Sequence, residues 1–308
     1  MSVLPPKTTS STAKINNDLQ IENHLSRLNP ESHTRSSVTS ADSGARTQFA
    51  SDEVCRELAE SGFFSYAAFV RSDCGIVVRR SSLTTNRRVP ICVAGLQTHA
   101  YLKVYNYHAR PWHDCFRRAK PLIEAKNYEL LHRTGIAVPD VLAFGCRRRL
   151  GRLVDGFIMT REIPGSVTLE AYFDEYGRNR SADICDWNCA RILTDLAGIV
   201  ARMHAANFFH IDLQWRNILV SRSNEIIEGL YILDCVRGGH RIHPLLRRHG
   251  MLRDLASLYK DARRFLSATQ QLRWLRQYFG VARLTETHHA IVRSILRDRE
   301  IKSPERSG

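Results

Sequence analysis

The chain has 308 residues, of which 43% are hydrophobic, so it is long enough for one large domain or for two lobes with a substantial core. No apolar run approaches the length of a membrane-spanning helix, and the first residues lack the apolar segment of a secretory signal. We therefore expect a cytoplasmic protein. The formal net charge of +14 suits nucleic acid, an anionic membrane or a phosphorylated substrate.

The eight cysteines show no pattern that indicates a metal site or a disulfide framework. None of them belongs to a CxxC pair, and Cys185 and Cys189 lie one helical turn apart without a matching second pair. The HRIH stretch, with His240 and His243, is a similarly weak metal motif. Free thiols are expected, as is usual in a cytoplasmic protein.

Residues 1–50 are rich in serine and threonine and poor in large apolar side chains, which is typical of a disordered tail. Folded structure is expected to begin at SDEVCRELAESG. Ser51 can cap a helix there, and Asp52 and Glu53 suit the first turn of that helix.

The sequence pattern of the next hundred residues predicts a β-sheet with one long helix. GIVVRR and VPICVAG have strand character and are separated by the turn-like SSLTTN, and AYLKVYNY alternates as a strand around Lys103. Residues 115–135 have helical periodicity that stops at Gly135, with Pro139 just beyond. VLAFGC and GFIMTREI predict two more strands.

The second half of the chain is mainly helical in pattern. Helical periodicity covers TLEAYFDEYG, WNCARILTDLAGIVARMHAAN and GMLRDLASLYKDARRFL, and more helices follow. Asp254, in the third of these stretches, is interpreted as an ordinary acid near a helix N-terminus. Two short strands, RNILV and GLYILDC, form a predicted hairpin that would bring Asp234 back beside Asn217.

The stretch HIDLQWRNILV places His210, Asp212 and Asn217 directly before this hairpin. Taken alone, it is compatible with a polar turn, because Asp and Asn side chains bond to nearby backbone. His210 alone is more often a structural core residue than a catalyst. The interpretation of this loop therefore depends on the rest of the chain.

Three further residues complete a set that is typical of kinases. Lys103 lies on a predicted strand, Glu124 on the following helix, and Asp234 at the exit of the later hairpin. Each alone is ordinary, and Glu129 is a rival to Glu124. In this order and on these elements, they match the layout of protein kinases.

The predicted fold class is therefore α+β, a bilobal protein-kinase-like fold. We expect a β-rich N-lobe with one long helix over residues 51–160, a mainly helical C-lobe over residues 161–300, and a flexible C-terminus at 301–308.

Each residue of the set has a chemical reason to be there. Lys103 supplies a cation for the phosphates of ATP, and Glu124 can hold that cation in position. Asn217 and Asp234 offer the oxygen ligands that Mg²⁺ prefers. Asp212 can accept the proton of an incoming hydroxyl. ATP and Mg²⁺ are therefore the expected cofactors.

Five stretches within roughly residues 75–265 resemble the lipopolysaccharide kinase family, which includes the kinases of the inner-core Kdo and heptose sugars, of the WaaP and InaA type. These stretches are IEAKNYELLHRTGIAVPDVLAFG, GFIMTREIPGSVTLEAYF, ARMHAANFFHIDLQWRNILV, ILDCVRG and RDLASLY. The resemblance implies transfer of the ATP γ-phosphate to a sugar hydroxyl of the lipopolysaccharide inner core. It also implies that MTREIPG is the hinge that receives adenine, through backbone groups near Arg161, Glu162 and Ile163.

A glycolipid acceptor fits the basic clusters in VRR, NRR, CRRRLGR and LLRRHGMLR, because that acceptor is anionic and anchored in a membrane. We therefore expect a peripheral location on the inner face of the inner membrane. The sequence does not indicate an oligomeric state, nor which sugar and hydroxyl accept the phosphate.

The sequence departs from the protein kinase pattern in three places. No GxGxxG precedes Lys103, and RSDCGIVVRR is the only plausible stand-in. Ile211 occupies the place of the arginine in the catalytic loop, so activation by loop phosphorylation is not expected. Asp234 is followed by Cys-Val rather than Phe-Gly, whereas Arg237 fits the lipopolysaccharide kinase pattern.

Other functions compete with a glycolipid kinase. A protein kinase or an aminoglycoside-type phosphotransferase would use the same residues. A catalytically silent pseudokinase that binds a partner is a further alternative, favoured by the missing glycine-rich loop and disfavoured by the intact set of site residues. Nucleic-acid binding would rest on charge alone, because no zinc finger, RRM or helix-turn-helix signature is present, and we do not expect it.

Overall fold

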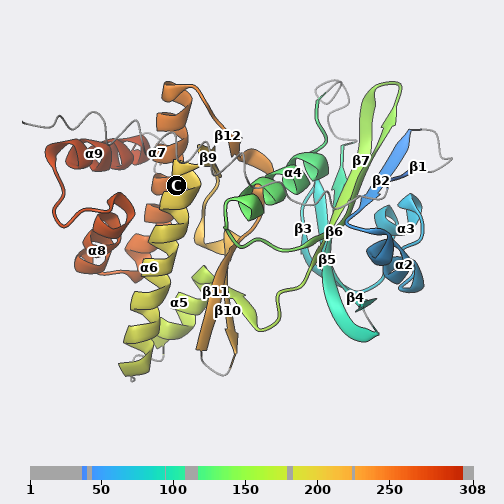
Figure 1. Ribbon diagram of the computed structural model, residues 1–308, viewed down its shortest axis with the longest axis horizontal. Helices are drawn as coiled ribbons and strands as arrows, with labels where there is room; N and C mark the ends of the chain where they lie inside the picture. Colours follow the sequence, from blue (N-terminus) through green and yellow to red (C-terminus); the bar gives the residue numbers. More distant parts are fainter. Residues whose placement is uncertain are drawn as a thin grey trace, which may run out of the picture. The chain divides into compact units, whose positions relative to one another are not determined.

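The computed structural model describes residues 37–39, 44–93, 95–107, 117–178, 183–223 and 226–300. Seven antiparallel strands of the described chain form one sheet in the order β1-β2-β6-β7-β5-β4-β3. Their bounds are Ser37–Thr39 (β1), Ala45–Phe49 (β2), Ile76–Arg80 (β3), Thr84–Val93 (β4), Leu96–Asn106 (β5), Val141–Arg149 (β6) and Arg152–Arg161 (β7). This sheet and the helices that follow it form the two lobes seen in Figure 1, and the predicted α+β kinase-like fold is confirmed.

The predicted start of folded structure at residue 51 is wrong. Strand β2 pairs with β6 before that point, and its residues are alternately buried and exposed, with Ala45 and Phe49 in the core. Five residues with only two apolar side chains leave little compositional trace, so the Ser/Thr content of the region concealed the strand. The rest of the predicted tail, residues 1–36 and 40–43, lies outside the described residues, as does the C-terminal 301–308.

The two faces of the sheet carry different cores. Lys103 pairs with Asn86 on β4 and Ile158 on β7, and these three residues define what we call the inner face. Helix α4 (Lys120–Arg133) packs on this side. Helices α2 (Asp52–Glu60) and α3 (Tyr66–Val70) cover the outer face, which carries Leu102 and Met159 (Figure 1). The alternation along β5 therefore fixes Lys103 toward α4.

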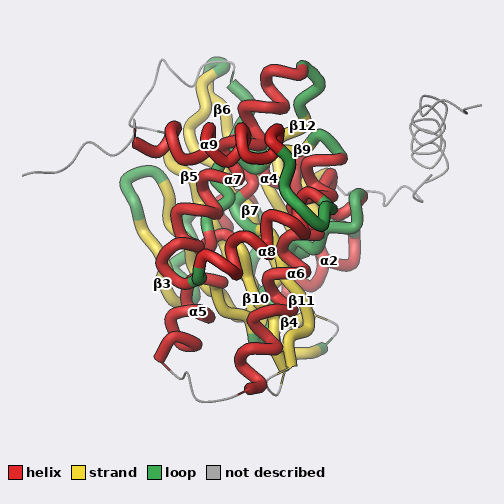
Figure 2. Tube along the Cα trace, turned by 90° about the vertical axis from the view of Figure 1, so that its left-hand side faces the viewer, coloured by secondary structure: helices red, strands yellow, loops and turns green. Residues whose placement is uncertain are grey.

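The C-lobe contains five of the described helices: α5 (Leu169–Arg178), α6 (Asp183–Ala205), α7 (Pro244–Phe265), α8 (Ala268–Phe279) and α9 (Glu286–Glu300). Figure 2 shows α6 to α9 on the side that faces the viewer, with the strands behind them. Local sequence sets their ends, as at α8, where Ser267 and Gln270 form a capping box and Gly280 ends the helix in the left-handed conformation.

Two small sheets of short strands flank the catalytic loop in the C-lobe. One small sheet joins β8 (Ser166–Thr168), β10 (Ile218–Ser223) and β11 (Ile226–Ile232), and another joins β9 (Phe208–Phe209) to β12 (Gly239–His240). The β10–β11 pair is the predicted hairpin. Two 3₁₀ turns, η1 (Trp215–Asn217) and η2 (Cys235–Arg237), lie just before and just after it.

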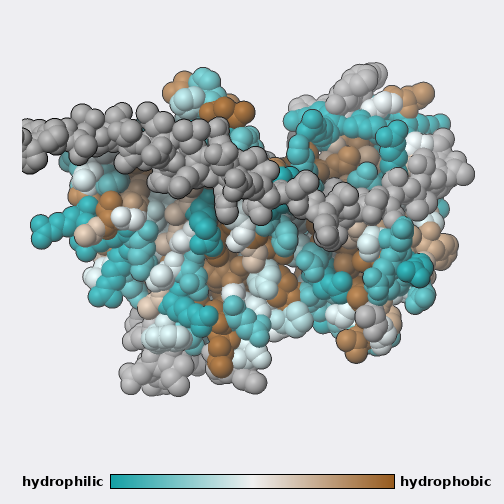
Figure 3. Space-filling model, in the orientation of Figure 1, coloured by the Kyte–Doolittle hydropathy of each residue, from teal (hydrophilic) through white to brown (hydrophobic). Residues whose placement is uncertain are grey.

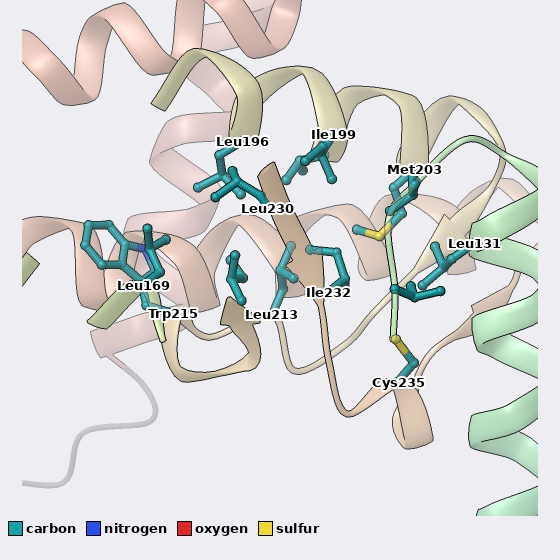
Figure 4. Packing of buried hydrophobic residues seen from close by; sticks show 14 of the residues in the cluster. Leu131, Leu169, Leu196, Ile199, Met203, Leu213, Trp215, Leu230, Ile232 and Cys235 are labelled. Carbon is teal, nitrogen blue, oxygen red and sulfur yellow. The ribbon is translucent and has the colours of Figure 1, made fainter. Parts of the chain in front are cut away.

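One hydrophobic cluster runs from the C-lobe to helix α4. Figure 4 shows Trp215, Leu213 and Ile232 packed below α6, with Cys235 and Leu131 continuing the cluster toward α4. Leu131 lies on α4 and is fully buried. The loop that carries the site residues is therefore anchored in a core that belongs to both lobes.

The surface is largely polar, and some of its arginines form ion pairs with neighbouring carboxylates. No helix of the described chain has the length and apolarity needed to cross a membrane. Hydrophilic residues cover much of the face drawn in Figure 3. Three arginines of the basic clusters have acidic partners: Arg87 with Asp73, Arg88 with Glu162, and Arg147 with Asp155. The six cysteines whose side chains are described are free thiols.

Candidate active site

The site is centred on the ammonium of Lys103. Its Nζ lies 2.7 Å from Asp234 Oδ1 and 3.3 Å from both carboxylate oxygens of Glu124. Burial alone would lower the pKa of Lys103, but the two carboxylates raise it above its ordinary value. The structure therefore brings together the predicted strand Lys, helix Glu and hairpin Asp, and Glu124 rather than Glu129 makes the contact.

Two tyrosines hold the Glu124 carboxylate. The Tyr105 hydroxyl donates to Oε2 at 2.6 Å and the Tyr128 hydroxyl donates to Oε1 at 3.2 Å. Tyr128 also accepts the backbone N–H of Asp234 at 3.0 Å, so one hydroxyl joins both carboxylate-bearing residues. Burial, followed by the charge of Glu124, raises the pKa of both tyrosines. Sequence reasoning missed both roles, although Tyr128 lies one helical turn after Glu124, a spacing that places them on one face.

Asp234 has a left-handed backbone, with φ of 56°. A non-glycine residue in this region costs about 1–3 kcal/mol and persists where the surroundings fix it. The hairpin supplies that constraint: Ile218 pairs with Ile232, and the Leu233 N–H donates to the Asn217 carbonyl at 2.8 Å. As predicted, the hairpin returns Asp234 to Asn217.

The charge state of Asp234 follows from its neighbours. Burial alone would raise its pKa, but Lys103 lowers it below the ordinary value, with smaller contributions from His210 and Arg79. The carboxylate is therefore ionised at neutral pH and suited to a cation.

The catalytic loop holds Asp212 and Asn217 in a fixed relation. The Asn217 side-chain amide donates to the Asp212 carbonyl at 2.9 Å, which leaves its Oδ1 as an acceptor. Gln214 Nε2 donates to Asp212 Oδ1 at 2.5 Å. Asp212 is half-buried, whereas Asn217 is buried. The amide oxygen and the Asp212 carboxylate are thus positioned by short local bonds.

Asp254 supports this loop from below, and its interpretation as an ordinary acid near a helix N-terminus is wrong. Helix α7 begins at Pro244, so Asp254 lies inside it and is fully buried. Its carboxylate accepts the backbone N–H of His210 at 2.8 Å and of Ile211 at 2.6 Å, and lies 3.2 Å from His204 Nε2. Ile211 has φ of 71°, which is rare for a β-branched residue, so Asp254 holds a strained turn.

Asp261 repeats this support two turns along the same helix. Its carboxylate accepts the Trp215 N–H at 2.9 Å. A spacing of seven residues keeps Asp254 and Asp261 on one helix face. The first and last parts of the catalytic loop are therefore bonded to one rigid element.

The predicted hinge offers fewer backbone groups than expected. The Arg161 N–H donates to the Asp140 carbonyl at 2.9 Å, and the Glu162 N–H donates to the His99 carbonyl at 3.0 Å. Within the described chain, the Ile163 N–H is the one amide of the predicted three that has no such bond. A purine that needs a backbone donor at this segment would therefore use Ile163.

The Glu162 side chain adds an ion pair beside the hinge. Arg88 donates to both carboxylate oxygens, at 2.7 and 2.8 Å, and Tyr101 donates at 3.4 Å. The hydrogen bonds from Arg88 lower the pKa of Glu162. Arg88 pairs with Tyr101 in register and lies on the inner face, so this end of the site is aromatic and polar.

RSDCGIVVRR is not a glycine-rich phosphate loop. Gly75 precedes β3, at the end of the hairpin far from its turn, and a Cβ there would lie 2.1 Å from the Arg88 carbonyl oxygen. Glycine serves close packing against β4 at this point. The turn itself, Ser81–Leu83, contains no glycine.

The donor set at Asn217 and Asp234 fits Mg²⁺. An amide oxygen and a carboxylate are hard oxygen ligands, and Mg²⁺ commonly takes one or two protein ligands together with phosphates and waters. In the described part of the chain, no group of three His, Cys, Asp or Glu side chains is placed to hold a metal ion.

Comparison with known proteins places the site in a family. Residues 96–278 match the family model described as "Lipopolysaccharide kinase (Kdo/WaaP) family", which spans more than half of the chain. The chain belongs to the lipopolysaccharide kinase (Kdo/WaaP) family. It is accordingly a phosphotransferase, and the resemblance seen in the sequence is confirmed. The matched residues contain Lys103, Glu124, Asp212, Asn217 and Asp234, whereas β3 and β4 precede them.

A solved structure shows the same fold. The structure described as "WaaP in complex with acyl carrier protein" is similar with a TM-score of 0.54 and 23% sequence identity, over 74% of this lipopolysaccharide kinase and 88% of that chain. No curated protein matches the chain.

Proposed function

We propose that the protein transfers the γ-phosphate of ATP to a sugar hydroxyl of the lipopolysaccharide inner core, on Kdo or heptose. The observation that carries this proposal is the assembly of Lys103, Glu124 and Asp234 at hydrogen-bonding distance above a loop that presents Asp212 and Asn217. Family membership supports a lipopolysaccharide acceptor, and the acceptor group would be an alcohol.

The charged residues divide between nucleotide and acceptor. Lys103 would bind phosphate oxygens of ATP, and Glu124, fixed by Tyr105 and Tyr128, would keep the ammonium in place. Mg²⁺ would be held by Asn217 and Asp234 and would neutralise phosphate charge when bound. The Ile163 N–H would donate to adenine.

Asp212 would act on the acceptor. It takes the proton of the sugar hydroxyl as that oxygen bonds to the γ-phosphorus, and the bond from the γ-phosphorus to its bridging oxygen breaks, leaving ADP. Phosphoryl transfer depends mainly on position and charge stabilisation, so the rigid loop is as important as the base.

Turnover of ATP with purified core acceptors tests this proposal. We expect ADP formation to require the acceptor, and mass spectrometry to find one added phosphate on the core oligosaccharide. Phosphate on protein substrates instead would indicate a protein kinase. Failure to bind Mg-ATP would contradict the proposal and favour a silent pseudokinase.

We also propose that the protein is cytoplasmic and lies against the membrane that holds its acceptor. The start of α7 and the residues before it are exposed, including Ile242 (79%), Leu245 (71%) and Leu246 (49%). Arg247 and Arg248 follow directly and are exposed too. Apolar side chains beside arginines suit the interface of an anionic bilayer.

An apolar cavity of about 290 Å³ favours a protein partner as well. Helices α6 to α9 line it, with Trp215 and Trp274 among side chains that are nearly all hydrophobic. The similar WaaP structure is a complex with acyl carrier protein. We infer that this chain binds an acyl carrier protein, whose acyl chain would enter the cavity.

Thermal unfolding with two forms of the carrier tests this partner. Acylated carrier protein should raise the melting temperature of the kinase, because ligands that bind only the folded state stabilise it. Carrier protein without an acyl group should have little effect. Equal effects of the two carrier forms would exclude the cavity as the binding site of the acyl chain.

A further inference from the structure

Strand β3 contains a β-bulge beside the site. Ile76 pairs with Arg88 and Val77 with Arg87, but the next pair joins Arg79 to Asn86, so Val78 is the extra residue. A bulge changes the alternation of side chains along a strand, and bulges occur next to active sites, where they redirect a side chain. Without it, Arg79 would point to the outer face with Val77.

The new register aligns Arg79 with the central lysine. Arg79 pairs with Asn86, and Asn86 pairs with Lys103, so the three side chains form one cross-strand row on the inner face. Arg80 instead pairs with Thr85, whose partner is Val104, and so lies on the outer face. Two adjacent arginines of the same edge strand therefore serve opposite faces of the sheet.

The surroundings of Arg79 suit an anion. Its side chain is exposed. It shares the inner-face row with Lys103, whose Nζ lies 2.7 Å from Asp234 Oδ1. Asn86 lies between Arg79 and Lys103 in this row. Its side-chain oxygen, Oδ1, is buried and has no hydrogen-bond partner among the described residues. That oxygen is an acceptor left open within the row.

The turn of this hairpin has few amides left for phosphate. The Ser81 N–H donates to the Thr84 carbonyl at 2.8 Å, and the Ser81 hydroxyl accepts the N–H groups of Leu83 (3.3 Å) and Thr84 (3.1 Å). A glycine-rich loop binds phosphates through such amides. Here they are used within the turn, so a cation is the group that the hairpin can offer.

We propose that Arg79 is the phosphate-binding residue of the β3–β4 hairpin, whose guanidinium bonds the β- or γ-phosphate oxygens of the nucleotide in place of a glycine-rich loop. The proposal rests on the proposed use of ATP. Guanidinium and phosphate form charge-assisted, often bidentate hydrogen bonds, which are among the strongest in proteins. The bulge at Val78 is the feature that places Arg79 for this contact.

Nucleotide affinities of four proteins test this role: the wild type, Arg79→Ala, Arg79→Lys and Arg80→Ala, each with Mg-ATP, Mg-ADP and adenosine by calorimetry. Arg80→Ala removes the same charge from the same strand on the opposite face, so it is the matched control. Arg79→Ala should bind Mg-ATP about tenfold more weakly, as expected when one charge-assisted hydrogen bond is lost. Its affinity for adenosine should not change, and Arg79→Lys should recover part of the loss.

The outcomes separate this inference from the proposed function. Mg-ATP binding by the wild type with equal affinities in Arg79→Ala and Arg80→Ala would overturn the role of Arg79 and leave the kinase proposal intact. An equal loss of adenosine and Mg-ATP affinity in Arg79→Ala would assign Arg79 a structural role and also overturn the proposal. Absence of Mg-ATP binding by the wild type would overturn both.

Discussion

The catalytic loop and the β3–β4 hairpin face the same site, but they are built in opposite ways. In the loop, Asp254 and Asp261 accept three backbone N–H groups, and His210 and Asn217 are buried. In the hairpin, every residue of β3 is exposed and the strand pairs on one side only, at an edge of the sheet.

The difference follows from what each region must do. A base and metal ligands need fixed geometry before the substrate arrives, and rigid support provides it. A segment that covers the phosphates has to admit and release the nucleotide, and an exposed edge strand with few contacts is easily displaced. Mutations in the loop should therefore affect turnover, and mutations in the hairpin should affect nucleotide affinity.

Asp212→Asn is the most severe test of the loop. The variant keeps the shape of the side chain and removes the proton acceptor, so turnover should fall by roughly 10²–10⁴-fold. Single-turnover rate and Mg-ATP affinity should be measured on one preparation. Normal turnover would make Asp212 a turn former, and a parallel loss of affinity would move it to metal or structural support.

Deletion of the N-terminal segment tests the other edge of the sheet. Removal of residues 1–36 should leave the melting temperature unchanged, because the sheet described begins after them. Removal of residues 1–49 also deletes β1 and β2, and loss of buried Phe49 alone should cost about 3–5 kcal/mol. Chemical denaturation of both truncations gives the comparison. A large destabilisation by the shorter deletion would show that residues 1–36 contribute to the fold.

Asp254→Asn tests the rigidity of the loop from a distance. The Asp254 carboxylate accepts the His210 and Ile211 N–H groups with one oxygen each, and an asparagine amide has a single oxygen. The buried N–H group that loses its acceptor should cost about 1–3 kcal/mol. Asp261→Asn is the matched control and should cost less, because its remaining amide oxygen can still accept the single Trp215 N–H. Unfolding free energy and turnover should fall together in Asp254→Asn. Unchanged turnover in a destabilised but folded variant would separate support from catalysis.

Lys103 connects the two regions, because it lies in the sheet and bonds to Asp234 below. Lys103→Ala should lower kcat/KM for ATP by about tenfold or more, because its charge-assisted bonds to phosphate are lost. Glu124→Ala should lower kcat/KM for ATP less, since Glu124 only positions the lysine. Steady-state KM for ATP and kcat report the effect. Full activity of Lys103→Ala would contradict the kinase alignment of the sheet.

The weakest effect is expected at the membrane. Binding to acidic vesicles should fall with added salt, since exposed charges are screened beyond about 10 Å at 0.1 M. Arg247→Ala and Arg248→Ala should each remove roughly 1 kcal/mol of this binding. Vesicle co-sedimentation over a salt series measures both. Salt-independent binding would assign attachment to the apolar residues Ile242 and Leu245.

Residues that act through local spacing could be predicted from the sequence, and residues that act through tertiary contacts could not. The order of Lys103, Asp212, Asn217 and Asp234 along alternating elements was sufficient to find the site. Asp254 looked ordinary because its partners lie more than forty positions away, at 3.2 Å or less in space.

Register is a second source of missed information. Arg79 and Arg80 are indistinguishable in the sequence. They lie on opposite faces because successive strand residues alternate, and the bulge at Val78 decides that Arg79 is the one on the inner face. Strand β2 was missed for a related reason, because its burial depends on pairing with β6 rather than on its own apolar content. Local patterns cannot reveal which partner a strand will have.

The attachment of α4 has a consequence for how the protein unfolds. Asn127 on α4 donates to the carbonyls of Cys235 (2.7 Å) and Gly238 (3.0 Å), and Leu131 lies in the core cluster of the C-lobe. The outer face of the sheet belongs to a separate cluster with α2 and α3. The cooperative units of the chain therefore cut across its two lobes. In hydrogen–deuterium exchange, the amides of α4 and α6 should become exposed to solvent in one cooperative unfolding step. The amides of β4 and α2 should exchange in a separate step.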